Sequence, residues 1–208
     1  MIDNPARGRI NAWLLDQLDD YMDDKYGAVK RRLFRDLPPT VVELGPGSGA
    51  NFRYYPRGTR VIAIEPNARM HPRLERAAAR HGLDLDLRAA GGETIDLPTQ
   101  SADFVCSTLV LCSVSNRAAV LGEVRRILRP GSRFVAIEHV AAPPRSAVAT
   151  LQRTIRRPWH WMFEGCELCN DTEAQIGRAG FQRVEIEPLK IKTLFAPIRY
   201  QIVAVCSA

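Results

Sequence analysis

Short, unbroken apolar segments alternate along this chain with longer amphipathic ones. "TVVELG" (40–45) and "RVIAIE" (60–65) have the branched apolar character of strands buried on both faces, and a helical pattern follows at 68–82. Further strands are predicted at 83–90, 102–111, 133–141, 183–191 and 199–208, and further helices at 117–131 and 172–181. Because strands that alternate with helices form parallel crossover units, we expect an α/β fold. This fold is a doubly wound, Rossmann-like sheet of seven mostly parallel strands with helices on both faces.

The length of 208 residues, with 46% hydrophobic residues, suits one domain with a buried core. We therefore predict a single domain over residues 1–208 with two additions. Apolar residues recur at three- and four-residue steps across 10–37, which predicts an N-terminal helical cap that Gly27 is placed to split. Residues 143–172 form a longer, aromatic and basic insertion, which on a regular sheet is the expected place of a substrate lid.

The formal charge of +6 comes mainly from arginines that are spread over several segments. Since they form no single block with interleaved aromatic residues, we expect no stable nucleic-acid partner, and an RNA methyltransferase remains a lesser alternative. The chain contains no run of about 18 uncharged apolar residues, and its N-terminus lacks the pattern of a signal peptide. We expect a cytoplasmic monomer or homodimer without a transmembrane segment.

The five cysteines, an odd and scattered set, predict reduced thiols and no disulfide framework. Cys166 and Cys169 form "CELC", but no second pair of ligands stands at a suitable spacing, so no metal site is predicted. Cys112 and Cys166 are interpreted as small, buried apolar residues.

The loop after the first predicted strand, "VVELGPGSG", places Gly45, Gly47 and Gly49 at the carboxyl end of that strand. Ligands of open parallel sheets bind at this end, and glycine lets the backbone approach them closely. The spacing differs from the G-x-G-x-x-G of dinucleotide sites, Pro46 removes a backbone donor, and the lysine of a P-loop is missing. Glu65 ends the next strand, where a carboxylate can accept both hydroxyls of a ribose. The loop therefore predicts a nucleoside ligand without a pyrophosphate.

Five motifs between about residues 40 and 140 resemble those of the class I S-adenosylmethionine-dependent methyltransferases. They stand in the same order as in that family. They are "VVELGPGSG", "VIAIEP", "GGETIDLP", "SADFV" and "RRILRPGSRF". The resemblance implies that S-adenosylmethionine is the cofactor. It also implies that Glu43 and the three glycines line its methionine portion, and that Glu65, followed by Pro66, binds its ribose.

The same resemblance implies that Gly91, Gly92 and Glu93 lie along adenine and that Thr108 lies near the methionine ammonium. Gly91 stands where many members have an aspartate that contacts adenine. This departure leaves the adenine contacts to backbone groups or to Glu93.

A closer resemblance extends from about Lys30 onward to the alkyl thiol methyltransferases, the methyltransferase-like 7 family of animal membranes. The segments that carry it are "GANFRYYPRG", "STLVLCSV", "EVRRILRPG", "EHVAAP" and "PWHWMFEGCEL". It implies a small lipophilic acceptor, a thiol before others. The animal proteins carry an N-terminal hydrophobic anchor, and here only the amphipathic segment 10–37 stands in its place. Membrane localisation is therefore not carried over, and peripheral membrane contact stays open.

Methyl transfer requires in-line orientation, exclusion of water and, for some acceptors, removal of a proton. A thiol with a pKa near about 8.5 needs little help, whereas a phenol, at about 10, needs a base. His139, at a predicted strand end, and His160, in the lid, are the candidate catalytic residues, and plain packing is the alternative for each. The alternative functions are O- or N-methylation of an aromatic or quinone-like metabolite, and cofactor binding without turnover.

Overall fold

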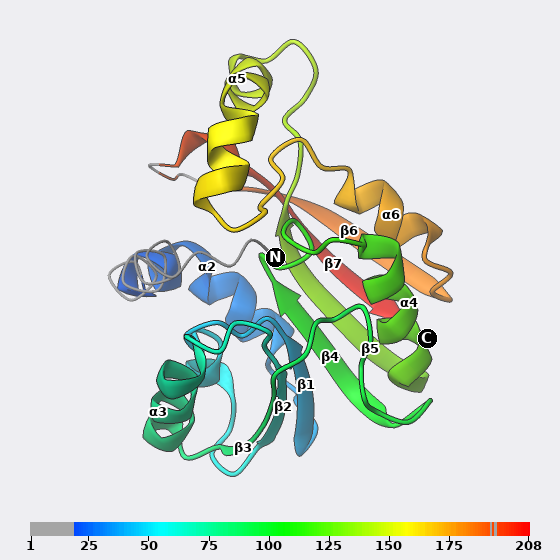
Figure 1. Cartoon of the computed structure of the whole chain (residues 1–208). Coiled ribbons are helices and arrows are strands. Elements are labelled where there is room, and N and C mark those ends of the chain that lie inside the picture. Colours follow the sequence, from blue (N-terminus) through cyan, green and yellow to red (C-terminus); the bar gives the residue numbers. More distant parts are fainter. Residues whose placement is uncertain (1–18, 192, 194) are drawn as a thin grey trace.

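The computed structural model describes residues 19–191, 193 and 195–208, so the part of the predicted N-terminal cap at 10–18 lies outside the described residues (Figure 1). Seven strands form one sheet in the order β3-β2-β1-β4-β5-β7-β6. They are β1 Thr40–Leu44, β2 Arg60–Ile64, β3 Asp84–Arg88, β4 Ala102–Thr108, β5 Leu128–His139, β6 Arg183–Lys190 and β7 Tyr200–Ser207. Strands β1 to β5 pair in parallel, and β7 is antiparallel to both of its neighbours. The predicted fold class is confirmed.

The described residues form five helices. They are α2 Asp19–Leu33, α3 His71–His81, α4 Arg117–Ile127, α5 Ala147–Met162 and α6 Thr172–Arg178, with 3-10 turns at η1 Phe52–Tyr54 and η2 Ala196–Ile198. All but α5 pack on the two faces of this sheet. Successive side chains of a strand point to opposite faces of the sheet, so the sheet separates two cores. Val42 packs in the core that includes α4 and α6, and Val41 packs in the core that includes α2 and α3. Helix α2 runs through Gly27 without a break, so the predicted split there is wrong. Helix α5 stands beyond the end of the sheet to which the β4 arrow points (Figure 1).

Strand β4 ends three residues earlier than the apolar pattern predicts. The prediction of a strand through residue 111 is wrong, because the backbone turns at Leu109, whose φ is +58°. The N–H groups of Val110 and Leu111 each donate to the Glu138 carboxylate at 3.0 Å instead of to a neighbouring strand. Leu111 is nevertheless fully buried, so its apolar character serves a buried turn.

The junction between α4 and β5 also differs from the prediction. The helix expected to reach residue 131 ends at Ile127, and β5 begins at once with Leu128, which pairs with Ala102 of β4. The register of this pairing then shifts across the stretch that contains Pro130 and Gly131, and Gly131 has a φ of +79°. The Pro-Gly pair therefore forms an irregularity within a strand, as glycine and proline do at bulges.

The segment predicted as an insertion contains a helix of 16 residues, α5, which the sequence analysis did not predict. Ser146 caps its N-terminus by accepting a hydrogen bond from the Ala149 N–H at 3.1 Å. Pro158 lies inside the helix, and Ala149 and Gln152 are its buried residues. A proline inside a helical pattern is typical of a helix break, so Pro158 conceals this helix from a reading of the sequence. Within the described part of the chain, no helix is both long and apolar enough to cross a membrane.

Candidate active site

The three glycines after β1 have positive φ angles of 56°, 59° and 86°, but they serve different purposes. A Cβ at Gly45 would lie 2.7 Å from a methyl of Val110, and one at Gly49 would lie 2.8 Å from the Cβ of Ala77. A Cβ at Gly47 would meet nothing within 4 Å. Gly45 and Gly49 are therefore required by packing, whereas Gly47 borders the open space that a ligand could enter.

Glu65 lies directly beside Gly47 and is buried. Its Oε2 accepts the N–H of Gly47 at 3.0 Å, and its Oε1 accepts the N–H of Asn67 at 2.9 Å. Burial raises the pKa of Glu65, and the two N–H donors oppose that rise. An ionised carboxylate has about four acceptor positions, so about two remain for the hydroxyls of a ribose. Pro66, which follows it, is exposed.

The buried carboxylate of Glu43 accepts hydrogen bonds from two polar side chains near the glycine loop. Its Oε1 accepts from Asn51 Nδ2 and its Oε2 from the Tyr55 hydroxyl, both at 2.7 Å. Asn51 Nδ2 also donates to Thr108 Oγ1 at 3.1 Å, while Asn51 Oδ1 is buried and has no hydrogen-bond partner among the described residues. An unpaired amide oxygen beside the Thr108 hydroxyl is a suitable acceptor for an ammonium group. The sequence analysis missed Asn51 and Tyr55, although both lie in its quoted "GANFRYYPRG".

The predicted adenine segment lies in the loop after β3. Glu93 Oε1 accepts the N–H of Ser115 at 3.1 Å, so its carboxylate is tied to the segment before α4. A Cβ at Gly92 would lie 3.3 Å from Val120 of α4, and one at Gly91 would lie 2.8 Å from the Glu93 carboxylate. The segment is thus a loop packed against α4 at Gly92, whereas, among the described residues, the only close neighbour of a Cβ at Gly91 is the flexible end of the Glu93 side chain.

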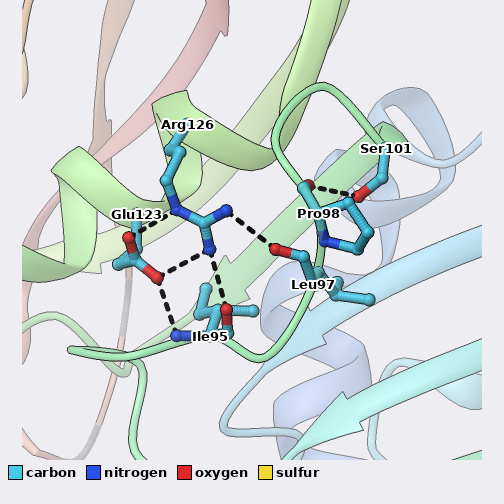
Figure 2. A network of polar contacts seen from close by, with 6 residues as sticks. All are labelled: Ile95, Leu97, Pro98, Ser101, Glu123 and Arg126. Carbon is cyan, nitrogen blue, oxygen red and sulfur yellow. Dashed lines mark hydrogen bonds and ion pairs between the residues drawn. The ribbon is translucent and has the colours of Figure 1, made fainter.

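Two residues of α4 hold the continuation of this loop, as Figure 2 shows. Glu123 Oε2 accepts the N–H of Ile95 at 2.8 Å. Arg126 donates to the carbonyl oxygens of Ile95 and Leu97, each at 2.7 Å, and pairs with Glu123 at 2.7 Å. The sequence analysis matched "EVRRILRPG" as a motif without assigning these side chains a role. Their role is to fix the loop that borders the predicted adenine site.

The end of β5 organises the other side of the site. Glu138 is completely buried, and its Oε1 accepts from Ser107 Oγ at 2.8 Å as well as from the two N–H groups of the turn after β4. Burial raises the pKa of Glu138, and the hydrogen bonds to it act in the opposite direction. This carboxylate brings the turn after β4, and with it Cys112, next to His139.

His139, Cys112 and Cys166 form a buried cluster whose three ligand atoms lie within 4.8 Å of one another. His139 Nε2 is 3.1 Å from Cys166 Sγ, and the two sulfur atoms are 3.7 Å apart. Soft ligands of these kinds are those that zinc or copper(I) prefers. The sequence analysis had paired Cys166 with Cys169, which is not part of this cluster.

The two histidines predicted as catalytic occupy different environments. His139 is buried, and both of its ring nitrogens lie within hydrogen-bond distance of other side chains. His160 is exposed on α5 and lies outside the cluster. The catalytic role of each stays a prediction.

The chain is similar in sequence to known methyltransferases. A protein-family profile described as "Methyltransferase domain" matches residues 42–136. Human thiol S-methyltransferase TMT1A is 35% identical over 192 residues, covering 87% of this chain and 77% of that protein. Human thiol S-methyltransferase TMT1B is 35% identical over 193 residues, covering 86% and 79%. The chain belongs to this thiol S-methyltransferase family.

Solved structures show the fold that this family shares with other methyltransferases. An S-adenosylmethionine-dependent methyltransferase from Thermotoga maritima superposes with a TM-score of 0.65 at 17% identity, covering 97% of this chain and 99% of that one. One from Aquifex aeolicus has a TM-score of 0.65 at 16% identity, covering 94% and 97%. Together with the family membership, they establish an S-adenosylmethionine-dependent methyltransferase with the Rossmann-like fold of such enzymes.

The residues of this family member fit S-adenosylmethionine as the methyl donor. Gly47 offers backbone at open space, and Glu65 has free acceptor positions beside it. Asn51 Oδ1 is a buried acceptor that has no partner in the described part of the chain. A loop without a lysine suits a ligand that carries no phosphate.

Proposed function

We propose that this enzyme transfers the methyl group of S-adenosylmethionine to the sulfur of a small lipophilic thiol. The observation that carries the proposal is the length of the alignment with TMT1A. It covers 87% of the chain, well beyond the residues 42–136 that match the general methyltransferase profile. The conserved part therefore includes sequence that donor binding alone does not require.

We assign the donor contacts by chemistry. Glu65 accepts hydrogen bonds from the ribose hydroxyls, Gly91, Gly92 and Glu93 border adenine, and Asn51 Oδ1 with Thr108 Oγ1 accepts the methionine ammonium. When bound, the donor supplies an activated methyl group on a sulfonium sulfur. The chain has only to orient the acceptor in line with that methyl group and to exclude water.

We place the acceptor beyond the ends of β4 and β5, under the segment 143–172 acting as a lid. The rings of Trp159 and Phe163, with centroids 4.2 Å apart, are half-buried there and provide apolar surface for a lipophilic acceptor. A thiol with a pKa of about 8.5 is partly ionised at neutral pH, so no strong base is required. A phenolic acceptor would need a base, and His139 and His160 are our proposed catalytic candidates for that role.

The proposal includes a small-molecule acceptor, a cytoplasmic location and a monomeric or homodimeric protein. It is tested by incubating the purified protein with S-adenosylmethionine and matched alkyl thiols, phenols and heteroaromatic amines, followed by mass spectrometry of the products. We expect S-methylated alkyl thiols to be the main products. Methylation of phenols instead, with a rate that falls below about pH 6.5, would support the O-methyltransferase alternative.

Two glycine variants separate ligand binding from folding. Gly47→Asn keeps a residue that tolerates positive φ and places its side chain in open space, so we expect near-normal stability but at least a tenfold loss of S-adenosylmethionine affinity. Gly45→Asn has the same chemistry but forces its Cβ against Val110, so we expect it to lower the melting temperature. Calorimetry and thermal unfolding measure the two effects. Full affinity in Gly47→Asn would place the donor elsewhere.

A further inference from the structure

The buried sulfur of Cys166 lies within hydrogen-bond distance of three side chains. Its Sγ is 3.1 Å from His139 Nε2, 3.3 Å from the indole N–H of Trp159 and 3.7 Å from Cys112 Sγ. An indole nitrogen can only donate a hydrogen bond, so the sulfur is the acceptor. Two ring nitrogens, those of Trp159 and His139, therefore lie close to one sulfur, and N–H groups directed at a sulfur stabilise a thiolate.

The position of the proton on His139 follows from Asn170. The Asn170 amide orientation is determined by its own bonds, because Nδ2 donates to the Glu167 carbonyl at 2.7 Å and Oδ1 accepts from the Thr172 hydroxyl at 2.8 Å. The same Nδ2 lies 3.4 Å from His139 Nδ1, so its second N–H is placed to donate to an unprotonated Nδ1. The ring proton is then on Nε2, directed at the sulfur of Cys166.

This tautomer also decides between two uses of the cluster. A metal ion bound at His139 Nε2 would require the proton on Nδ1, where it would face the N–H group of Asn170. Flipping the Asn170 amide would place its oxygen against the Glu167 carbonyl. The surroundings of His139 thus favour a hydrogen bond to a thiolate over a metal ligand.

The charges around the cluster separate the two cysteines. The neighbouring thiol of Cys112 lowers the pKa of Cys166, with His139 and Trp159 acting in the same direction against burial. The Cys166 sulfur, burial and the nearby Glu138 carboxylate raise the pKa of Cys112. The result is one thiolate in contact with one protonated thiol.

The other buried cysteines are the natural comparison. Burial raises the pKa of Cys106 well above its usual value, and it raises the pKa of Cys206 to about 12. Cys106 has a Tyr55 hydroxyl at 3.2 Å, and no nitrogen donor to it is found among the residues that the structure describes. Both are ordinary buried thiols, so reactivity is expected at Cys166 alone among the buried set.

We propose that Cys166 is a redox-reactive thiolate that forms a reversible disulfide with Cys112 when the protein meets a hydroperoxide. In the first step the Cys166 sulfur attacks one peroxide oxygen and the O–O bond breaks. With hydrogen peroxide, the hydroxide that leaves takes up a proton to become water, and Cys166 becomes a sulfenic acid. In the second step Cys112 loses its proton and its sulfur displaces the hydroxyl from Cys166 as water. Two thiols are oxidised, and one peroxide is reduced to two waters.

The disulfide would join two segments that already touch. Cys112 lies on the turn after β4, and its carbonyl accepts the N–H of Glu167 at 2.8 Å, one residue beyond Cys166. The sulfur atoms need to approach from 3.7 Å to about 2.05 Å. The bond would lock the segment after α5 onto the acceptor side, so we expect methyl transfer to stop on oxidation. This effect on activity rests on the proposed function, whereas formation of the bond does not.

The test is a digest of the full-length protein after treatment with an equal amount of hydrogen peroxide. Trypsin releases residues 89–117 with Cys106 and Cys112, and residues 157–178 with Cys166 and Cys169. We expect these two peptides to be joined without reductant and separated by it. The joined pair should disappear in Cys166→Ser and Cys112→Ser and persist in the matched control Cys169→Ser. A joined pair that persists in Cys166→Ser, or the absence of one in the native chain, would overturn the proposal.

A second measurement uses the unaltered chain, so that it does not depend on a variant that folds. Labelling of Cys166 by iodoacetamide should change less than about twofold between pH 8 and pH 6, whereas a free small thiol in the same solution should slow by about tenfold per unit of pH. A tenfold decrease per unit at Cys166 would make it an ordinary thiol. Stoichiometric zinc that co-purifies and protects both cysteines would make the cluster a metal site and overturn the proposal.

Discussion

Three buried carboxylates decide the chemistry of the site at the scale of single residues. Glu43, Glu65 and Glu138 lie at or just beyond the carboxyl ends of three parallel strands, and burial raises the pKa of each. Each is partly compensated by N–H or O–H donors from neighbouring loops. Buried acids of this kind weaken folding unless they are well bonded, so their concentration at one edge of the sheet marks a site for ligands.

The Glu43 carboxyl predicts a specific dependence of stability on pH. Its pKa rises from 4.5 to about 7 in the folded chain, so the folded state binds more protons than the unfolded state between these values. Its contribution to stability is therefore fully present below about pH 4.5 and is lost as the pH rises through about 7. We expect Glu43→Gln, which cannot titrate, to gain up to about 3 kcal/mol relative to the native chain between pH 5 and pH 8.

Urea unfolding at several pH values measures this gain. Glu123→Gln is the matched control, because the Arg126 pair lowers the pKa of Glu123 and keeps its titration below this pH range. If the native chain and Glu43→Gln gave parallel curves of stability against pH, the Glu43 carboxyl would be charged throughout.

At the scale of elements, the turn after β4 is formed by its neighbour β5. The apolar run that follows Thr108 is typical of a strand, yet Glu138 takes up the N–H groups that a strand would use for pairing. This turn carries Cys112 to the cluster and Val110 against Gly45. One carboxylate thus determines both the end of a strand and the position of Cys112 beside His139.

Replacing Glu138 should destabilise the chain in proportion to the number of hydrogen-bond donors that lose their acceptor. Glu138→Ala leaves the Ser107 hydroxyl and two backbone N–H groups buried without an acceptor, and such groups cost about 1–3 kcal/mol each. We expect a loss of at least about 3 kcal/mol in the free energy of unfolding at pH 7. Glu138→Gln keeps an oxygen in place, so we expect less than half of that loss. Equal losses in the two variants would mean that side-chain volume, and not hydrogen bonding, holds the turn.

At the scale of the whole molecule, one sheet joins the donor side to the acceptor side. The loops after β1, β2 and β3 supply the predicted contacts to S-adenosylmethionine, and β4, β5 and the segment after α5 supply the cluster around Cys166. Because β1 and β4 are adjacent strands, the two sides meet at the middle of the sheet. A ligand there binds the folded chain alone, since the unfolded chain has no such edge.

Ligand binding should therefore raise the stability of the whole chain. S-adenosylmethionine at a hundred times its dissociation constant stabilises by about 2.7 kcal/mol. For a chain of this size we expect the melting temperature to rise by roughly 5–10 °C. ATP at the same concentration is the control, because the glycine loop has no lysine for phosphate. Equal shifts with the two ligands would contradict the predicted selectivity.

Short stretches of sequence predict those features of the fold that depend on residues close together in the chain. The strands at β1 and β2 and the left-handed Gly82 that ends α3 follow from short stretches of sequence, as does the place of Glu65 at the edge of the glycine loop. Helix α5 is missing from the sequence-based prediction because Pro158, which lies inside it, is typical of a helix break. The Pro-Gly pair after α4 predicts a helix end. Its true place within β5 depends on pairing with β4, which lies elsewhere in the sequence.

The sequence by itself determined the sheet, the donor loop and the family, because these depend on periodicity and on spacings of a few residues. Only the tertiary structure decided the turn after β4, the separate reasons for the three glycines and the joining of Cys112, His139 and Cys166. His139 is 27 residues from Cys166, and Cys112 is 54 residues from it. No local pattern records such a contact, because the folded sheet alone brings the ends of β4 and β5 under the segment after α5.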